Sequence, residues 1–254
     1  MTQGIIVLVH GYLDGPRVWS RLISRLAPQG WKIVPVALRS SAAGAAGAGS
    51  DRQLEGYATD VVRQIGEVTA DASVPVVVAG HSMGAQVAEL AALQLGDRLA
   101  GLVLITAAPL AGYSLPPAVM ERFAARAGLT DREAIGAGKR GLAVELDAEA
   151  LDILIDGTVA TQRDDALAQL QAWTGGHAAG RTSSALTCPV LCVATDDTFF
   201  TEDVVAATAT RFKDVSIEKV PHAGHWPQLE QPSVLAEVLR RFIAALAPLS
   251  SARH

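Results

Sequence analysis

The sequence lacks any stretch suited to crossing a membrane, because no charge-free apolar run approaches the ~18 residues that a spanning helix needs. It also has no basic run, since its Lys and Arg residues are scattered and the net charge is −5. We therefore expect neither nucleic acid nor a membrane as a partner. No basic region and no small-residue cleavage site follows Met1, which predicts a cytoplasmic protein.

Cysteine is scarce as well, with Cys188 and Cys192 the only two. On a single strand they would share a face but lie roughly 13 Å apart by strand rise. That separation is too long for a disulfide, so we expect both to be core residues. We expect neither a metal site nor a cofactor, and nothing in the sequence indicates an oligomeric state.

Hydrophobic residues, by contrast, make up 50% of the 254 positions, which suits one α/β domain with a sizeable core. Short apolar runs typical of buried strands alternate with helical patterns. This alternation predicts a doubly wound, mostly parallel sheet. The expected strands are 4–9, 31–38, 74–79, 99–105, 189–194 and 216–220, and the expected helices are 17–27, 54–68, 87–95, 202–212 and 232–246.

The pattern changes after the fourth expected strand. Helical patterns follow one another without a strand, at 117–127, 131–138, 148–155 and 159–173. We therefore predict an α/β core of residues 1–108 and 182–254, with residues 109–181 inserted as a helical cap or lid. Residues 39–50 are almost entirely Ser, Ala and Gly, which is typical of a loop.

One motif carries chemistry: Gly80-His81-Ser82-Met83-Gly84 joins an expected strand to an expected helix. This context predicts a sharp turn that exposes the Ser82 hydroxyl at the end of the strand. A serine hydroxyl is a poor nucleophile at neutral pH and needs a base, which in turn needs an acceptor to fix its tautomer. The sequence therefore predicts a catalytic Ser82 with a histidine and an acid elsewhere.

Histidine and acid candidates follow the later strands. His222 and His225 both come after the last strand, and we favour His225 because Gly224 allows a close approach. Asp196 and Asp197 both follow the preceding strand, and Asp197 is the better placed by its distance from the strand end. The order Ser, Asp, His along the chain is one of the known solutions for a catalytic triad.

Two backbone N–H groups are expected to form an oxyanion hole beside the nucleophile. One belongs to Met83, directly after Ser82. The other should come from the loop after the first strand, with Tyr12 as the first choice and Leu13 as the second.

Taken together, these motifs resemble the α/β-hydrolase superfamily. The matching pieces are His10-Gly11, the motif around Ser82, the strand that ends at Asp196-Asp197, and Gly224-His225-Trp226. The resemblance implies a serine nucleophile, a histidine base, an aspartate partner and a helical lid. The immediate start at a central strand is similar to the compact branch of plant-type methyl esterases and hydroxynitrile lyases.

Two departures from that branch favour hydrolysis. The lyases carry a Lys directly after the catalytic histidine, where this chain has Trp226, and a Thr where it has Gly11. The cofactor-free dioxygenases of the fold place their acid after the preceding strand, where this chain has Thr106-Ala107-Ala108 and no carboxylate.

The expected substrate is a small or medium apolar carboxylic ester or lactone, cleaved through an acyl-enzyme intermediate. Tyr113, Trp173, Phe199 and Trp226 are the candidate pocket residues, and no Arg or Lys occupies a position that marks it as a clamp for a substrate carboxylate. The alternative is a non-hydrolytic member of the fold: a ligand-binding receptor, a C–C lyase such as a hydroxynitrile lyase, or a cofactor-free oxygenase.

Overall fold

A computed structural model describes residues 3–26, 30–38, 52–69 and 71–250, with side chains to residue 246. Its centre is one six-stranded, all-parallel sheet in the order β2-β1-β3-β4-β5-β6. The strands are β1 (Gly4–Val9), β2 (Trp31–Val36), β3 (Val76–His81), β4 (Leu99–Ile105), β5 (Val190–Ala194) and β6 (Val215–Lys219). The predicted parallel sheet is confirmed.

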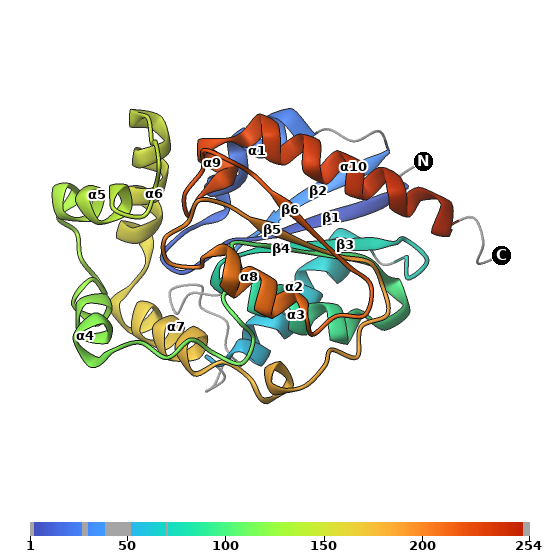
Figure 1. Cartoon of the computed structure of the whole chain (residues 1–254), viewed down its shortest axis with the longest axis horizontal. Helices are drawn as coiled ribbons and strands as arrows, with labels where there is room; N and C mark the ends of the chain where they lie inside the picture. Colours follow the sequence, from blue (N-terminus) through green and yellow to red (C-terminus); the bar gives the residue numbers. More distant parts are fainter. Residues whose placement is uncertain (1–2, 27–29, 39–51, 70, 251–254) are drawn as a thin grey trace.

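Helices cover both faces of the sheet, as expected of a doubly wound fold (Figure 1). One face carries α1 (Ser20–Leu26), which follows the short 3-10 turn η1 (Pro16–Trp19), and the long α10 (Pro232–Ser250). The opposite face carries α2 (Leu54–Val68), α3 (Met83–Leu95) and α8 (Glu202–Ala209). Each face has its own cluster of buried side chains, so the sheet lies between two hydrophobic cores.

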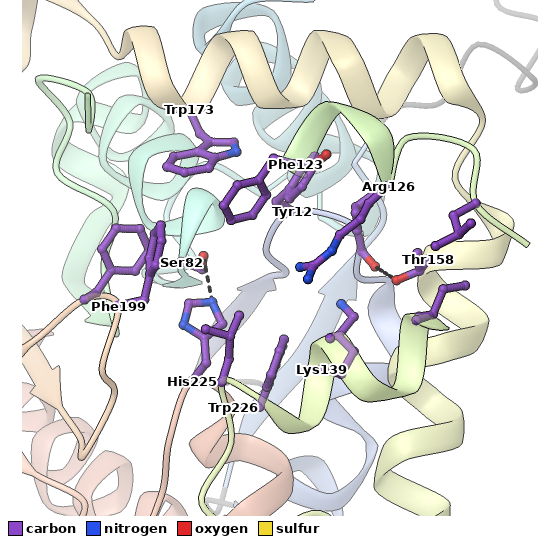
Figure 2. Close-up of a pocket in the computed structure, with 16 residues that line it drawn as sticks. Tyr12, Ser82, Phe123, Arg126, Lys139, Thr158, Trp173, Phe199, His225 and Trp226 are labelled. Atoms are coloured by element: carbon purple, nitrogen blue, oxygen red, sulfur yellow. Dashed lines mark hydrogen bonds between the residues drawn. The ribbon is translucent and has the colours of Figure 1, made fainter. Parts of the chain in front are cut away.

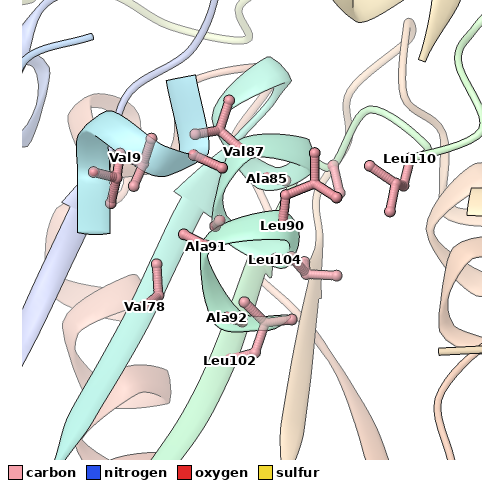
Figure 3. Close-up of a cluster of buried hydrophobic side chains, with 14 of the residues drawn as sticks. Val9, Val78, Ala85, Val87, Leu90, Ala91, Ala92, Leu102, Leu104 and Leu110 are labelled. Atoms are coloured by element: carbon pink, nitrogen blue, oxygen red, sulfur yellow. The ribbon is translucent and has the colours of Figure 1, made fainter. Parts of the chain in front are cut away.

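Alanine-rich packing fixes α3 against the middle of the sheet (Figure 3). Ala88, Ala91 and Ala92 are fully buried, and their short side chains allow the helix axis to approach β3 and β4 closely. All six residues of β3 are buried as well. The start of α3 is therefore held rigidly at the carboxyl end of β3, where ligands bind in sheets of this kind.

Four helices lie between β4 and β5 in sequence and beyond the carboxyl ends of the strands in space (Figure 1). They are α4 (Pro117–Ala125), α5 (Arg132–Arg140), α6 (Ala148–Ala160) and α7 (Arg163–Gly175). We refer to this part as the helical segment 109–181. The expected helix 159–173 starts later than predicted, because Val159 continues α6 and a break at Thr161-Gln162 separates it from α7.

Several smaller features complete the fold. The short α9 (Pro227–Glu230), which was not predicted, precedes α10. Both cysteines are free thiols; Cys192 is buried in β5, whereas Cys188 is only partly buried before it. Among the described residues, no helix is both long and apolar enough to span a bilayer. The predicted loop 39–50 lies outside the described residues.

Candidate active site

Ser82 lies in the tight turn between β3 and α3, with a backbone φ of 55°. Left-handed backbone is costly for a residue with a side chain, so the surrounding structure must enforce it. A Cβ on Gly80 would overlap the carbonyl oxygen of Gly84, and one on Gly84 would overlap that of His10. Only glycine at these two positions lets strand and helix approach closely enough to form the turn.

Backbone hydrogen bonds secure this turn to the neighbouring strand. The Ser82 N–H donates to the Ile105 carbonyl at 3.0 Å, and the Ala108 N–H donates to the Ser82 carbonyl at 3.2 Å. The backbone that carries the Ser82 side chain is thus fixed both by β3, which precedes it, and by hydrogen bonds to the end of β4 and to the residues that follow it.

His225 lies between Ser82 and Asp197 and contacts both. Its Nε2 is 3.1 Å from Ser82 Oγ, and its Nδ1 is 2.7 Å from Asp197 Oδ2. The backbone of His225 is also held on both sides: its N–H donates to the Leu142 carbonyl at 2.9 Å, and its carbonyl accepts from His81 Nε2 at 2.6 Å. The structure therefore brings Ser82, His225 and Asp197 into one line.

Asp197 and its neighbour Asp196 have different surroundings. Asp197 is 4% exposed; its Oδ1 accepts the Phe199 N–H at 2.8 Å. Burial opposes ionisation of Asp197, but its interaction with His225, together with the backbone N–H groups of Phe199 and Phe200, outweighs burial and lowers the pKa of the carboxyl group.

Asp196 instead lies at the surface, where it accepts the His222 N–H at 2.8 Å and pairs with Lys219 at 2.8 Å. The hydrogen bond and charge of Lys219, followed by the bond from His222, lower the pKa of Asp196. The alternative acid Asp196 thus accepts a hydrogen bond from the backbone of the alternative base His222, and both residues are exposed at the protein surface.

The two predicted oxyanion donors belong to backbone segments close to Ser82. Met83 is the first residue of α3, where a backbone N–H has no acceptor within its own helix. Tyr12 follows Gly11, and a Cβ at Gly11 would lie 3.0 Å from the Ser82 Cβ. The N–H of Leu13, the second choice, is directed instead towards Gln169 Oε1 at 3.5 Å.

A buried ionic network, which sequence reasoning missed, lies below these loops. Asp14 Oδ1 accepts from Lys139 Nζ of α5 at 3.1 Å, and Asp14 Oδ2 accepts from Trp226 Nε1 at 3.1 Å. Burial opposes ionisation of Asp14, but the charge of Lys139 helps to outweigh it, so the pKa of Asp14 is lowered. Asp14 thereby links the loop after β1 to the helical segment 109–181 and to the residue after His225.

His81 is fully buried beside this network. Burial, and then the charge of His225, lower its pKa to about 3, so the ring is neutral at physiological pH. Its Nε2 therefore carries the proton that it donates to the His225 carbonyl, and its Nδ1 lies 3.7 Å from Asp14 Oδ2. His81 supports the backbone of His225 without competing for the Ser82 proton.

A pocket of about 690 Å³, part of it open to solvent, lies above Ser82 and His225 (Figure 2). The predicted residues Trp173, Phe199 and Trp226 line it, together with Tyr12, Phe123 and Phe200. Tyr113 does not line it, contrary to the prediction. Its ring packs against Phe199 and Phe200, with centroid distances of 5.6 and 5.3 Å, and so supports the pocket wall from behind.

Two cations also line the pocket, Arg126 at the end of α4 and Lys139 on α5. Sequence reasoning did not single them out, because an inward-facing basic residue on a helix has the same pattern in the sequence as an exposed one. No aspartate or glutamate is among the described residues that line the pocket. Within the described ranges, no group of three His, Cys, Asp or Glu side chains could hold a metal ion.

Comparison with known proteins yields a family and a set of similar folds. Residues 6–238 match the model of the alpha/beta hydrolase family. A malate-bound esterase from Thermogutta terrifontis has 20% identity and a TM-score of 0.77, with 97% of this chain and 91% of that one covered. An esterase from Exiguobacterium antarcticum has 16% identity and a TM-score of 0.78, with 95% and 92% covered.

Neighbours with other activities have the same fold. A bromoperoxidase from Bacillus anthracis has 15% identity and a TM-score of 0.81, with 96% of this chain and 92% of that one covered. At these identities the likeness concerns the fold alone. The search of curated proteins found no match.

Proposed function

The chain belongs to the alpha/beta hydrolase family, and from this premise we propose that it is a serine hydrolase of small or medium apolar carboxylic esters or lactones. Ser82 is the nucleophile, His225 the general base and Asp197 its partner. The observation that carries the proposal is the line of contacts from Asp197 Oδ2 to His225 Nδ1 at 2.7 Å and from His225 Nε2 to Ser82 Oγ at 3.1 Å. Both distances are within the reach of proton transfer.

Acylation begins when Ser82 Oγ attacks the ester carbonyl and His225 Nε2 accepts the hydroxyl proton. Asp197 holds the Nδ1 proton and stabilises the imidazolium that forms. The Met83 and Tyr12 N–H groups stabilise the oxyanion of the tetrahedral intermediate. His225 then returns the proton to the leaving oxygen, the carbon–oxygen bond breaks, and the acyl group remains on Ser82.

Deacylation repeats these steps with water in place of Ser82. His225 removes a proton from the water, the resulting hydroxide attacks the acyl carbonyl, and the Ser82 oxygen leaves with a proton from His225. The products are a carboxylic acid and an alcohol, or one hydroxy acid from a lactone. The helical segment 109–181 acts as the cap that excludes bulk water.

The pocket wall supports an apolar substrate. Trp173, Phe123 and Phe199 pack edge to face, with ring centroids 5.7 to 6.2 Å apart, and present apolar surface above Ser82. Residues of the helical segment 109–181 and of the core contribute to this wall, so we propose that the cap helps to set substrate size.

Hydrolysis of p-nitrophenyl acetate and butyrate tests the proposal. The wild-type protein should release p-nitrophenol with turnover, and the Ser82→Ala variant should lose activity by a factor of 10³ or more. Circular dichroism of both proteins controls for folding. Turnover that survives in Ser82→Ala would refute the nucleophile, and a folded wild type without turnover would favour a receptor.

A further inference from the structure

We infer that the substrate carries one carboxylate, held by Arg126, on the side of the pocket opposite Phe199. The inference rests on the proposed hydrolase function and refines its apolar substrate by one charged end. Figure 2 shows the Arg126 guanidinium and the Lys139 ammonium pointing into the same space, on the side of the pocket opposite Phe199.

Arg126 has no charged partner within the described residues. The residue is half-buried, and its guanidinium donates no hydrogen bond to them and forms no ion pair with them. The Phe123 ring lies 5.9 Å from the guanidinium carbon, measured to the ring centroid, and Gly138 of α5 is also close. A guanidinium has five N–H donors and no acceptor of its own, so on a half-buried side chain that lines a pocket these donors are available to a ligand. The missing acceptor is what a ligand would supply.

Lys139 differs from Arg126 in being neutralised already. Asp14 Oδ1 lies 3.1 Å from Lys139 Nζ, and both side chains are largely buried. Among the described residues that line the pocket, Arg126 is therefore the cation without a negatively charged partner. A carboxylate supplies one negative charge, and its two oxygens match the two-pronged donor geometry of a guanidinium. A phosphate monoester, with a charge of about −1.5 to −2 at pH 7, would exceed that requirement.

The fold keeps room for the guanidinium in this position. Gly138 lies within α5, where glycine costs about 0.5–1 kcal/mol relative to alanine. A Cβ at Gly138 would lie 3.0 Å from Arg126 Nη2 and 3.1 Å from Cζ, closer than ordinary contact. Because Gly138 has no side chain, the Arg126 guanidinium can lie in contact with α5 at this position.

Binding measured on the inactive Ser82→Ala protein tests the inference without any catalysis. Calorimetry should compare the monomethyl and dimethyl esters of glutarate, adipate and pimelate at low salt. Within each pair the two ligands differ by one charge and one methyl group. We expect at least one anionic half ester to bind about tenfold or more tightly than its neutral diester.

Substitutions assign that preference to one side chain. Arg126→Gln, in the Ser82→Ala background, should remove it, and Arg126→Lys should retain part of it, because the charge stays while the two-pronged geometry is lost. Arg122→Gln is the matched control, since Arg122 lies on the same helix but is exposed. It should leave the preference unchanged.

Equal binding of half esters and diesters, no binding of any half ester, or a preference that survives in Arg126→Gln would each overturn the inference. The proposed function fails separately, through absence of Ser82-dependent hydrolysis of p-nitrophenyl butyrate. Hydrolysis of that neutral ester without any preference for the half esters would support the proposed hydrolase function and refute the carboxylate subsite.

Discussion

Replacing Asp197 by asparagine should remove most of the activity, whereas the same change at Asp196 should have little effect. Asp197 is 4% exposed, and its Oδ2 lies 2.7 Å from His225 Nδ1. An asparagine there has no negative charge to stabilise the imidazolium, and its amide can donate to Nδ1 and so favour the wrong histidine tautomer. Such a change in another serine hydrolase costs about 10⁴-fold in kcat.

We expect kcat for p-nitrophenyl butyrate to fall by about 10³- to 10⁴-fold in Asp197→Asn, which corresponds to about 4–5 kcal/mol of barrier. Asp196→Asn is a matched control, because it removes one carboxylate from the adjacent residue. Asp196 is exposed and pairs with Lys219, and a surface ion pair contributes about 0–1 kcal/mol to stability. Its kcat should stay within about twofold of wild type.

Steady-state kinetics at pH 8, with the thermal midpoint of each variant as a folding check, measures the difference. Similar losses in both variants, or a larger loss in Asp196→Asn, would refute the assignment of Asp197. A loss in Asp197→Asn accompanied by unfolding would be resolved by Asp197→Glu, which keeps the charge and should retain part of the activity if the protein folds.

Three further predictions concern stability. The pKa of His81 is about 3 in the folded protein and about 6.5 unfolded, so only the unfolded state gains this proton as pH falls below 6.5. Urea denaturation should show about 1.6 kcal/mol of unfolding free energy lost from pH 6.5 to 5.0 through this residue, and an equal pH dependence in His81→Asn would contradict it. Asp14→Asn should cost about 3 kcal/mol or more, because it leaves the largely buried Lys139 unpaired. Adding Lys139→Met to that variant should restore part of the loss, and a further decrease would count against the pairing. Gly80→Ala should lower the thermal midpoint sharply or prevent folding, because its Cβ would overlap the Gly84 carbonyl; an unchanged midpoint would show that the turn can relax.

Much of the fold could be predicted from the sequence, because a strand that is buried on both faces of a sheet appears in the sequence as a run of apolar residues. The central strands β1 and β3 are buried at every position, and apart from His81 at the end of β3 they are apolar throughout. The errors of the prediction concentrate at helix ends, because local contacts determine the residue at which a helix begins or ends. Helix α7 begins after Gln162 rather than at Val159, because the backbone at Thr161-Gln162 is extended and apolar spacing does not reveal this break.

The candidate site, like the fold, could be predicted from the sequence only in part. Ser82, Asp197 and His225 could be singled out because each follows a strand whose carboxyl end faces the site, and the structure brings their side chains together. Arg126 and Lys139 could not be singled out from the sequence, because they lie on helices whose orientation depends on packing against the core. The sequence therefore indicated a pocket without cations, whereas Arg126 and Lys139 both line it in the structure.

The most direct test of the central claim is covalent labelling with a fluorophosphonate, located by mass spectrometry of the digested protein. An activated serine should react once per chain, and the adduct should lie on the peptide that contains Ser82. Labelling should disappear in Ser82→Ala and slow strongly in His225→Gln, because the base no longer removes the hydroxyl proton. An adduct elsewhere, or a folded wild-type protein that does not react, would contradict the claim that Ser82 is an activated nucleophile.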